Sequence, residues 1–375
     1  MPDQPESAGL RLDGGMQVLI APDKFAGTLS AVEAAQAIAE GWVRHAPDDV
    51  LDLAPMSDGG PGFVDVLQTA LGGELLALTV EAPHGDTVPG SVLFVEDVAY
   101  VESAQACGLH LLQGGAELGS TTGVGQLIAA AIESGARRVV VGLGGSGTND
   151  AGAGMLAALG ATSDGILDSG AAALDTVHEV DLGPALERLG DVELVAASDV
   201  DNPLTGLFGA TKIFGPQKGI AEDRLPAVDG VLEELAAATE RRTALEKGAG
   251  AAGGLGFALL LLGAARTPGF DVVSEAVDLP ARARAADLVI TGEGAFDFSS
   301  RSGKVPYGVA TVAADAVRPC VALAGRVLVG SREMRALGIE AAYSLVDLVG
   351  EERALGDPAG SLADLAARVA RTWSR

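Results

Sequence analysis

The feature that most constrains this chain is one local design that recurs along it. An apolar, strand-like run leads into a glycine-rich turn carrying acids, amides or lysines, and helical sequence follows. Six segments contain such turns: "APDKFAGTLS", "PMSDGGPG", "GLGGSGTND", "SDVDNPLTG…FGPQKG", "GAGAAGGLG" and "ITGEGAFDFSSRSGK". Alternating strands and helices predict a parallel sheet with helices on its faces. Ligands of open α/β sheets bind beyond the carboxyl ends of the strands, so this many turns favour a substrate site.

The rhythm of strands and helices divides the chain into parts. It changes near Gly72, where several strand-like runs follow one another without a helix, and it resumes near residue 280. We therefore predict an α/β fold of two α/β domains. A parallel-sheet domain of Rossmann or flavodoxin type (residues 16–71 and 280–375) is split by an inserted mixed-sheet domain (residues 72–279). Residues 1–15 lack a basic region and an apolar core, so they read as a flexible N-terminal extension and not as a signal peptide.

Composition excludes several classes of protein. The 375 residues carry a formal charge of −26, which would repel nucleic acid over most of the surface. The most apolar run, residues 255–265, is about half the ~20 residues that a membrane span needs, and it predicts a buried helix. Cys107 and Cys320 form no C-x-x-C pattern and are predicted to be buried in a protein of the reducing cytoplasm.

Known nucleotide and hydrolase signatures fail on context or spacing. "GAGAAG" (248–253) matches G-x-G-x-x-G, but the preceding "RRTALEK" reads as helix where a dinucleotide fold needs a strand. No G-x-x-x-x-G-K-[ST], G-x-S-x-G or H-E-x-x-H sequence occurs. The chain is therefore neither a Walker-type enzyme nor a hydrolase of these classes, and its histidines are predicted to be structural or solvated.

Lysine placement points to phosphate chemistry. The chain has five lysines against twenty arginines, and Lys24, Lys218 and Lys304 lie within glycine-rich turns. A flexible ammonium suits a moving phosphoryl group. The alternative is that these are ordinary solvated loop cations.

Acidic and amide side chains follow several predicted strands. Asp199 and Asp297 are our preferred general base or Mg²⁺ ligands, because phosphoryl transfer needs Mg²⁺ held by one or two carboxylates and a base or orienting group for the attacking hydroxyl. Asn149 and Asp150 are predicted to cap the helix that follows them. Further acids at strand ends are Asp58, Asp201 and Glu293.

The segments together resemble the type 1 glycerate kinases of bacteria, in the same order from Met16 to the "AAYSLVD" strand. "FGPQKG" and "VITGEG…D…S…GK" are the most specific of them. The resemblance implies phosphorylation of D-glycerate by ATP with Mg²⁺, and an active site in the cleft between the two domains. Homo-oligomer formation and the choice between 2- and 3-phosphoglycerate stay open.

The resemblance and the turns together define the candidate site. The catalytic candidates are Asp199, Asp297, Lys218 and Lys304, of which the two aspartates are also the candidate Mg²⁺ ligands. The candidates for binding substrate or phosphate are Asp23, Lys24, Asp58, Gly59, Gly60, Gly144, Gly145, Ser146, Thr148, Asn149, Asn202, Gln217, Gly292, Glu293, Gly294 and Ser300.

Some positions depart from the pattern of the family. Ala26 and Ala295 stand where basic residues are usual, Pro61 replaces a glutamate, and Thr122 replaces a larger arginine or tyrosine. Two alternatives therefore remain: a kinase of another small hydroxy acid, or a catalytically weak protein that binds a carboxylate or a nucleotide.

Overall fold

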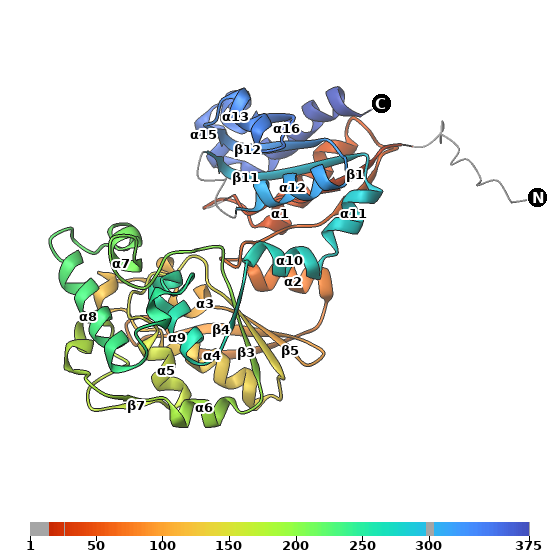
Figure 1. The fold of residues 1–375 in the computed structure, drawn as a ribbon. Coiled ribbons are helices and arrows are strands. Elements are labelled where there is room, and N and C mark those ends of the chain that lie inside the picture. Colours follow the sequence, from red (N-terminus) through yellow and green to blue (C-terminus); the bar gives the residue numbers. More distant parts are fainter. Residues whose placement is uncertain (1–14, 26, 298–303, 375) are drawn as a thin grey trace, which may run out of the picture. The chain divides into compact units, whose positions relative to one another are not determined.

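The computed structural model describes residues 15–25, 27–297 and 304–374, and they form two compact units (Figure 1). The first unit comprises residues 15–55, 279–297 and 309–374, and the second comprises residues 56–278 and 304–308. The predicted N-terminal extension lies, except for Gly15, outside the described residues.

The first unit is built on a parallel sheet of five strands in the order β13-β12-β11-β1-β2. Numbered along the chain, this is the order 2-1-3-4-5 of flavodoxin-like folds, as predicted. Val18 of β1 pairs with Leu288 on one side and with Leu51 on the other, so β1 is an inner strand. The strands are β1 (Gln17–Ile20), β2 (Val50–Leu53), β11 (Leu288–Phe296), β12 (Cys320–Val327) and β13 (Ala341–Ser344).

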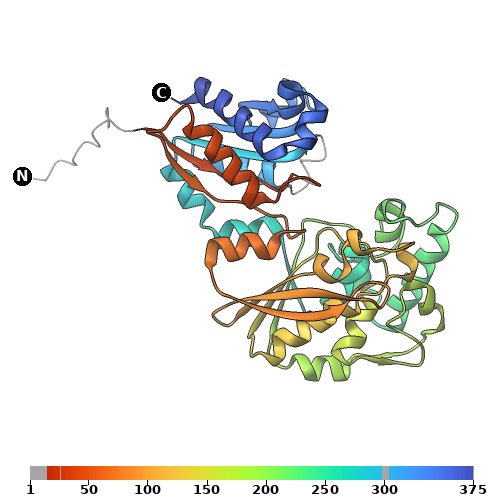
Figure 2. The same cartoon turned by 180° about the vertical axis from the view of Figure 1, so that it is seen from behind.

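Helix α1 (Ala31–Val43) shows how local sequence fixes this unit. The Glu33 N–H donates to Ser30 Oγ (3.2 Å), and the Ser30 N–H donates to Glu33 Oε2 (2.8 Å), which is the predicted capping box. The apolar face of α1 shares one buried cluster with α16 (Pro358–Trp373), and Figure 2 shows the two helices side by side. The other helices of this part of the chain are α11 (Leu279–Ala285), α12 (Val305–Asp315), α13 (Ser331–Ala336), α14 (Leu345–Val349) and α15 (Glu351–Gly356).

The second unit contains a mixed sheet of six strands in the order β10-β9-β6-β5-β4-β3. Its first three strands along the chain are antiparallel neighbours, and the rest are parallel, which confirms the expected mixed sheet. The strands are β3 (Glu74–Glu81), β4 (Thr87–Val95), β5 (Val98–Glu102), β6 (Arg138–Gly142), β9 (Glu193–Ala197) and β10 (Ala265–Thr267). A separate pair joins β7 (Thr162–Ser163) to β8 (Val180–Asp181).

Helices of the second unit bury the apolar residues of this sheet. The predicted buried helix is α9 (Leu255–Leu261), whose Leu255 and Leu259 pack in one cluster with Val139 and Val141 of β6. Cys107 and Cys320 are buried free thiols, as predicted. The other helices are α2 (Phe63–Leu71), α3 (Ala104–Cys107), α4 (Thr122–Glu133), α5 (Ala153–Leu159), α6 (Gly183–Leu189), α7 (Ala210–Phe214), α8 (Leu225–Ala238) and α10 (Gly269–Ala276).

One helix lies in a different unit from the one that the sequence rhythm assigned to it. Residues 63–71 form the expected helix, α2, but it belongs to the second unit and not to the first. The Phe63 ring packs edge-on against Tyr100 of β5, with ring centroids 6.3 Å apart. This packing is long-range, so the β-loop-α rhythm could not reveal it. The remainder of the predicted division stays a prediction.

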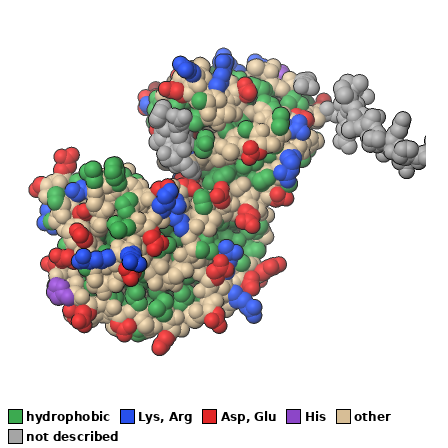
Figure 3. All heavy atoms as spheres, in the orientation of Figure 1, with side chains coloured by type: hydrophobic (Ala, Val, Ile, Leu, Met, Phe, Trp, Pro, Cys, Tyr) green, Lys and Arg blue, Asp and Glu red, His purple; other side chains and the backbone are tan. Residues whose placement is uncertain are grey.

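The surface carries the acidic excess that the composition gives. Figure 3 shows lysine and arginine side chains scattered among acidic ones over the visible face. Among the described helices, none is long and apolar enough to cross a membrane.

Candidate active site

Two glycine-rich segments meet at the carboxyl ends of β6 and β9 in the second unit. The Gly144 N–H donates to Gly59 O (3.0 Å), and the Leu143 N–H donates to Ala197 O (3.1 Å). A Cβ on Gly144 would lie 2.4 Å from the Cα of Gly60, so only glycine allows this approach. The structure thus brings together three of the predicted site glycines.

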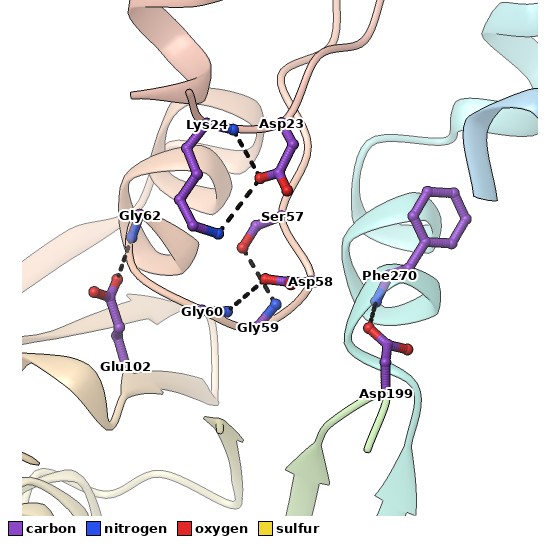
Figure 4. A network of polar contacts seen from close by, with 10 residues as sticks. All are labelled: Asp23, Lys24, Ser57, Asp58, Gly59, Gly60, Gly62, Glu102, Asp199 and Phe270. Atoms are coloured by element: carbon purple, nitrogen blue, oxygen red, sulfur yellow. Dashed lines mark hydrogen bonds and ion pairs between the residues drawn. The ribbon is translucent and has the colours of Figure 1, made fainter. Parts of the chain in front are cut away.

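The turn at residues 57–62 is held by its own side chains and by Glu102 (Figure 4). The Gly59 N–H donates to Ser57 Oγ (3.2 Å), and the Gly60 N–H donates to Asp58 Oδ1 (3.1 Å). Glu102 Oε2 accepts from the N–H groups of Gly62 (3.1 Å) and Val64 (3.3 Å) at the start of α2. These bonds fix the position of Asp58.

Sequence reasoning missed Glu102. Its side chain is only 7% exposed and lies at the last position of β5, before a short helix. The available signal was an acid that ends the strand "VAYVE", the same signal that singled out Asp58 and Asp199. Glu102 was overlooked because no glycine-rich turn follows its strand, and such turns were the pattern used to find the other candidates.

Asp199 has a strongly perturbed carboxyl. It follows β9, and its Oδ2 accepts the N–H of Phe270 at the start of α10 (3.4 Å; Figure 4). Burial, and then the negative charge of Asp58, raise the pKa of Asp199 to about 7, whereas the Phe270 N–H acts to lower it. A carboxyl with this pKa can exchange a proton at neutral pH, as a general base must.

Lys218 points into the protein. Its side chain is 4% exposed, and its Nζ donates to Ser146 Oγ (2.9 Å) and to Thr148 O (2.7 Å). Burial lowers the pKa of this ammonium to about 8. The structure therefore brings Lys218, Ser146 and Thr148 together, with the lysine bonded to the loop after β6.

Asp150 fastens the same loop to the start of α4. It accepts from the N–H (2.9 Å) and the Oγ1 (2.8 Å) of Thr121, and from the N–H groups of Gly152 and Gly154 (3.2 Å each). Asp150 thus bonds the start of α5 as predicted, although the N-cap residue itself is Gly152. The predicted cap role of Asn149 is wrong, because its Nδ2 donates to Thr211 Oγ1 instead (3.0 Å).

The remaining candidates of this unit are less buried or serve the backbone. Asn202 Nδ2 donates to Phe208 O (2.8 Å), which closes the loop after β9. Gly145 and Gln217 are exposed, and Lys304 is half-buried just before α12. Asp201 forms surface ion pairs with Lys247 (3.2 Å) and Arg266 (2.6 Å), which lower its pKa.

The turn "GAGAAGGLG" has a packing role. A Cβ on Gly253 would lie 2.0 Å from Thr148 O, and one on Gly254 would lie 2.4 Å from the Cα of Ala151. Gly253 and Gly254 also have positive φ values of 70° and 94°. These glycines let the segment lie directly against the loop after β6.

The first unit carries its own set of candidates at the switch point of its strand order, between β1 and β11. The Asp23 N–H donates to Gly292 O (2.8 Å). Asp23 Oδ1 accepts the Lys24 N–H (2.7 Å) and lies 3.6 Å from Lys24 Nζ (Figure 4). Ligands of this fold type bind at such a switch point.

The predicted turn after "DLVITG" begins later than expected. Strand β11 continues to Phe296 beside β12, so Gly292, Glu293 and Gly294 lie within a strand. A Cβ on Gly292 would lie 2.3 Å from Leu323 O, so glycine permits the close pairing. Asp297 directly follows the strand, whereas Ser300 and Ala26 lie outside the described residues.

The profile of the "Glycerate kinase family" matches residues 18–374. The chain belongs to the glycerate kinase family. It is 41% identical over 345 residues to a protein named glycerate kinase from Bacillus subtilis, which covers 88% of this chain and 90% of that protein. It is 38% identical to a protein named glycerate 2-kinase from Escherichia coli, over 89% of this chain and 92% of that protein.

A solved structure has the same fold. The crystal structure of a Salmonella typhimurium LT2 protein described as glycerate kinase 2 superposes with a TM-score of 0.79 at 34% identity. The match covers 96% of this chain and 98% of that one. The described residues of this chain contain no group of three or more His, Cys, Asp or Glu side chains that could hold a metal ion by themselves.

We predict that Gly144→Ala destabilises this glycerate kinase family member by about 1–3 kcal/mol, because the new Cβ would meet the backbone of Gly60. Gly230→Ala is the matched control. Gly230 lies within α8 with open space around its Cα, so this change should stabilise the protein by up to about 1 kcal/mol. Urea unfolding of the three proteins measures both effects. Equal stability of the two variants would contradict the tight backbone approach.

Asp199→Asn should change how stability depends on pH. The folded-state pKa of Asp199 is raised from 3.8 to about 7, so between these values the folded protein holds a proton that the unfolded chain has released. Stability contributed by this group is therefore lost as pH rises through that window. The melting temperature of Asp199→Asn relative to wild type should rise from about pH 4 to about pH 7 and then level off. A constant difference in melting temperature between Asp199→Asn and wild type across this range would refute the raised pKa.

Proposed function

We propose that this protein transfers the γ-phosphoryl group of ATP to D-glycerate and forms 2-phosphoglycerate. The observation that carries the proposal is the family match over residues 18–374, supported by relatives named glycerate kinase along most of their length. The name of the Escherichia coli relative, glycerate 2-kinase, supports the 2-hydroxyl as the acceptor.

Asp199 is our choice of general base. Its pKa of about 7 lets it take the proton of the attacking hydroxyl at neutral pH, and the Phe270 N–H orients its carboxylate. The hydroxyl oxygen forms the new bond to phosphorus, and the bond from the γ-phosphorus to the bridging oxygen of ADP breaks. Asp58 supports this role electrostatically, because its charge helps to keep the pKa of Asp199 high.

The anionic groups of the substrates need donors and cations. The amide of Gly145 and the hydroxyl of Ser146 are proposed to bind an anionic oxygen, whereas the Gly144 amide is already bonded to Gly59 O. Thr148 and Asn149 support that loop from its buried side. We propose that Lys24 and Lys304 balance phosphate charge, because both are half-buried lysines. Lys24 Nζ lies 3.6 Å from Asp23 Oδ1, and Lys304 directly precedes α12.

Mg²⁺ fits the carboxylates of this chain. Mg²⁺ in kinases uses one or two carboxylates together with phosphates, and the coupled charges of Asp58 and Asp199 create a local excess of negative charge that a cation would relieve. We propose Asp297 as a carboxylate that would hold it, with Asp199 as the alternative ligand in place of its role as the base. When bound, Mg²⁺ supplies neutralisation of phosphate charge.

The test is an ADP-release assay on the purified chain with ATP, Mg²⁺ and a panel of acids: D-glycerate, L-glycerate, tartronate, lactate and hydroxypyruvate. We expect the highest kcat/KM for D-glycerate and a ³¹P spectrum of 2-phosphoglycerate. Turnover confined to another acid would overturn D-glycerate as the substrate and favour a kinase of another small hydroxy acid. Tight binding without turnover of any acid would overturn the kinase proposal.

We predict that Asp297→Asn and Lys304→Ala each lower kcat/KM for D-glycerate by roughly 100-fold or more, because charges that stabilise the transition state are lost. Steady-state kinetics measure the effect, and melting temperatures near that of wild type show that the variants are folded. The exposed residues Asp175 and Lys247 supply matched controls, Asp175→Asn and Lys247→Ala, which should keep near-normal rates. Near-normal rates in both site variants would reject these assignments.

A further inference from the structure

We infer that Lys218 is a positioning residue: it holds the Ser146 hydroxyl as a hydrogen-bond donor for an anionic oxygen of the substrate, and it does not itself contact a phosphate. This inference rests on the proposed function and changes the role that the sequence suggested for this lysine. The anionic oxygen belongs to a carboxylate or to a phosphate, and the experiment below distinguishes the two.

The placement of Lys218 argues against direct contact with a phosphate. The residue ends a short 3₁₀ helix, η4 (Pro216–Lys218), in which the preceding Gln217 is exposed. The lysine itself is 4% exposed, and its Nζ already donates to Ser146 Oγ and to Thr148 O. Two of the three N–H donors of the ammonium are thus used inside the protein, and the low exposure of the residue leaves the third little access to an outside phosphate.

The chemistry of the Lys218–Ser146 bond sets the direction of the serine proton. An ammonium group has donors and no lone pair, so Ser146 Oγ must be the acceptor in this bond. A hydroxyl has one proton of its own, which must then point away from the ammonium. Within the described residues, Lys218 is the hydrogen-bond partner of this hydroxyl, so its proton is available to a ligand.

Backbone hydrogen bonds hold the chain on both sides of Ser146 in place. The Gly147 N–H donates to Cys107 O (2.7 Å), and the Leu109 N–H donates to Gly145 O (2.9 Å). These two bonds fix the residues on both sides of Ser146 against the segment that follows β5. Ser146 is 8% exposed and directly follows the exposed Gly145, so it lies next to the solvent-exposed part of the loop.

Titration of Lys218 would reverse the bond. Burial lowers the pKa of Lys218 to about 8, and the titratable groups that act on it, Cys107 and Asp150, both act to raise it. A neutral amine has a lone pair and can accept the Ser146 proton, which turns the hydroxyl away from a ligand. The donor function of Ser146 should therefore fade as pH rises through about 8.

The experiment is a double-mutant cycle of Lys218→Met and Ser146→Ala in the full chain, read as the KM values for D-glycerate and ATP and as kcat. Each single variant should raise one KM by roughly 10- to 100-fold, the effect of losing a hydrogen bond to a charged group. The double variant should be no worse than the poorer single variant. A raised KM for glycerate identifies the carboxylate as the ligand, and a raised KM for ATP identifies a phosphate. Lys212→Met, at a half-buried lysine of α7, is the control.

The pH profile tests the same inference without altering Lys218. Wild-type kcat/KM should fall above about pH 8, and Ser146→Ala should lack this fall. Multiplicative losses in the double variant would show that Lys218 acts on the substrate directly. If kcat/KM of Ser146→Ala falls above pH 8 as it does in wild type, the inference is also overturned. The pH profile remains a valid test even where Lys218→Met does not fold.

Hydrogen exchange separates this inference from the kinase proposal. If the wild type phosphorylates none of the acids, the proposed function fails, but the positioning role can still be measured. Amides of residues 143–152 should exchange faster in Lys218→Met than in wild type or Lys212→Met, because two side-chain anchors of the loop are gone. Unchanged exchange in this loop would overturn the positioning role.

Discussion

The close approach of two backbones, at Gly144 and at Gly59–Gly60, is the constraint on which the second unit's site depends. The bond from the Gly144 N–H to Gly59 O places the turn that carries Asp58 over the ends of β6 and β9. Asp58 in turn acts on the pKa of Asp199 at the end of β9. A side chain at Gly144 would separate these loops, so the glycine content of the turns serves backbone packing as much as ligand contact.

Burial then sets the charge states of the groups that this packing assembles. It raises the pKa of Asp199 and of Asp150, and it lowers the pKa of Lys218. The consequences differ because the partners differ. Among the described residues, Asp150 receives four hydrogen bonds and ties elements together, whereas Asp199 receives one. The pKa of Asp199 is about 7, so this carboxyl can exchange a proton at neutral pH.

Much of the fold could be predicted from the sequence because its signals are local. The capping box at Ser30 and the apolar strands with following turns each depend on a few adjacent residues. Features that depend on long-range packing could not be predicted in this way. The ring of Phe63 on Tyr100 carries α2 into the second unit, and the pairing with β12 extends β11 through the expected turn. The candidate residues could be found because they follow strand ends. The inward direction of Lys218 and the bonds of Glu102 to the turn before α2 could not, because they depend on contacts with residues far along the chain.

The strand order of the first unit has a consequence for folding during synthesis on the ribosome. Strand β11, which lies between β1 and β12, is encoded after the whole contiguous stretch of residues 56–278. When that stretch leaves the exit tunnel, β1 has only β2 beside it, and its other edge has unpaired N–H and C=O groups. The inserted unit has its six-stranded sheet complete at that moment, since its strands add in order along the chain from β3 to β10. During synthesis the second unit can therefore fold first. The open edge of β1 stays unpaired until residues 288–296 have been made and pair with it as β11.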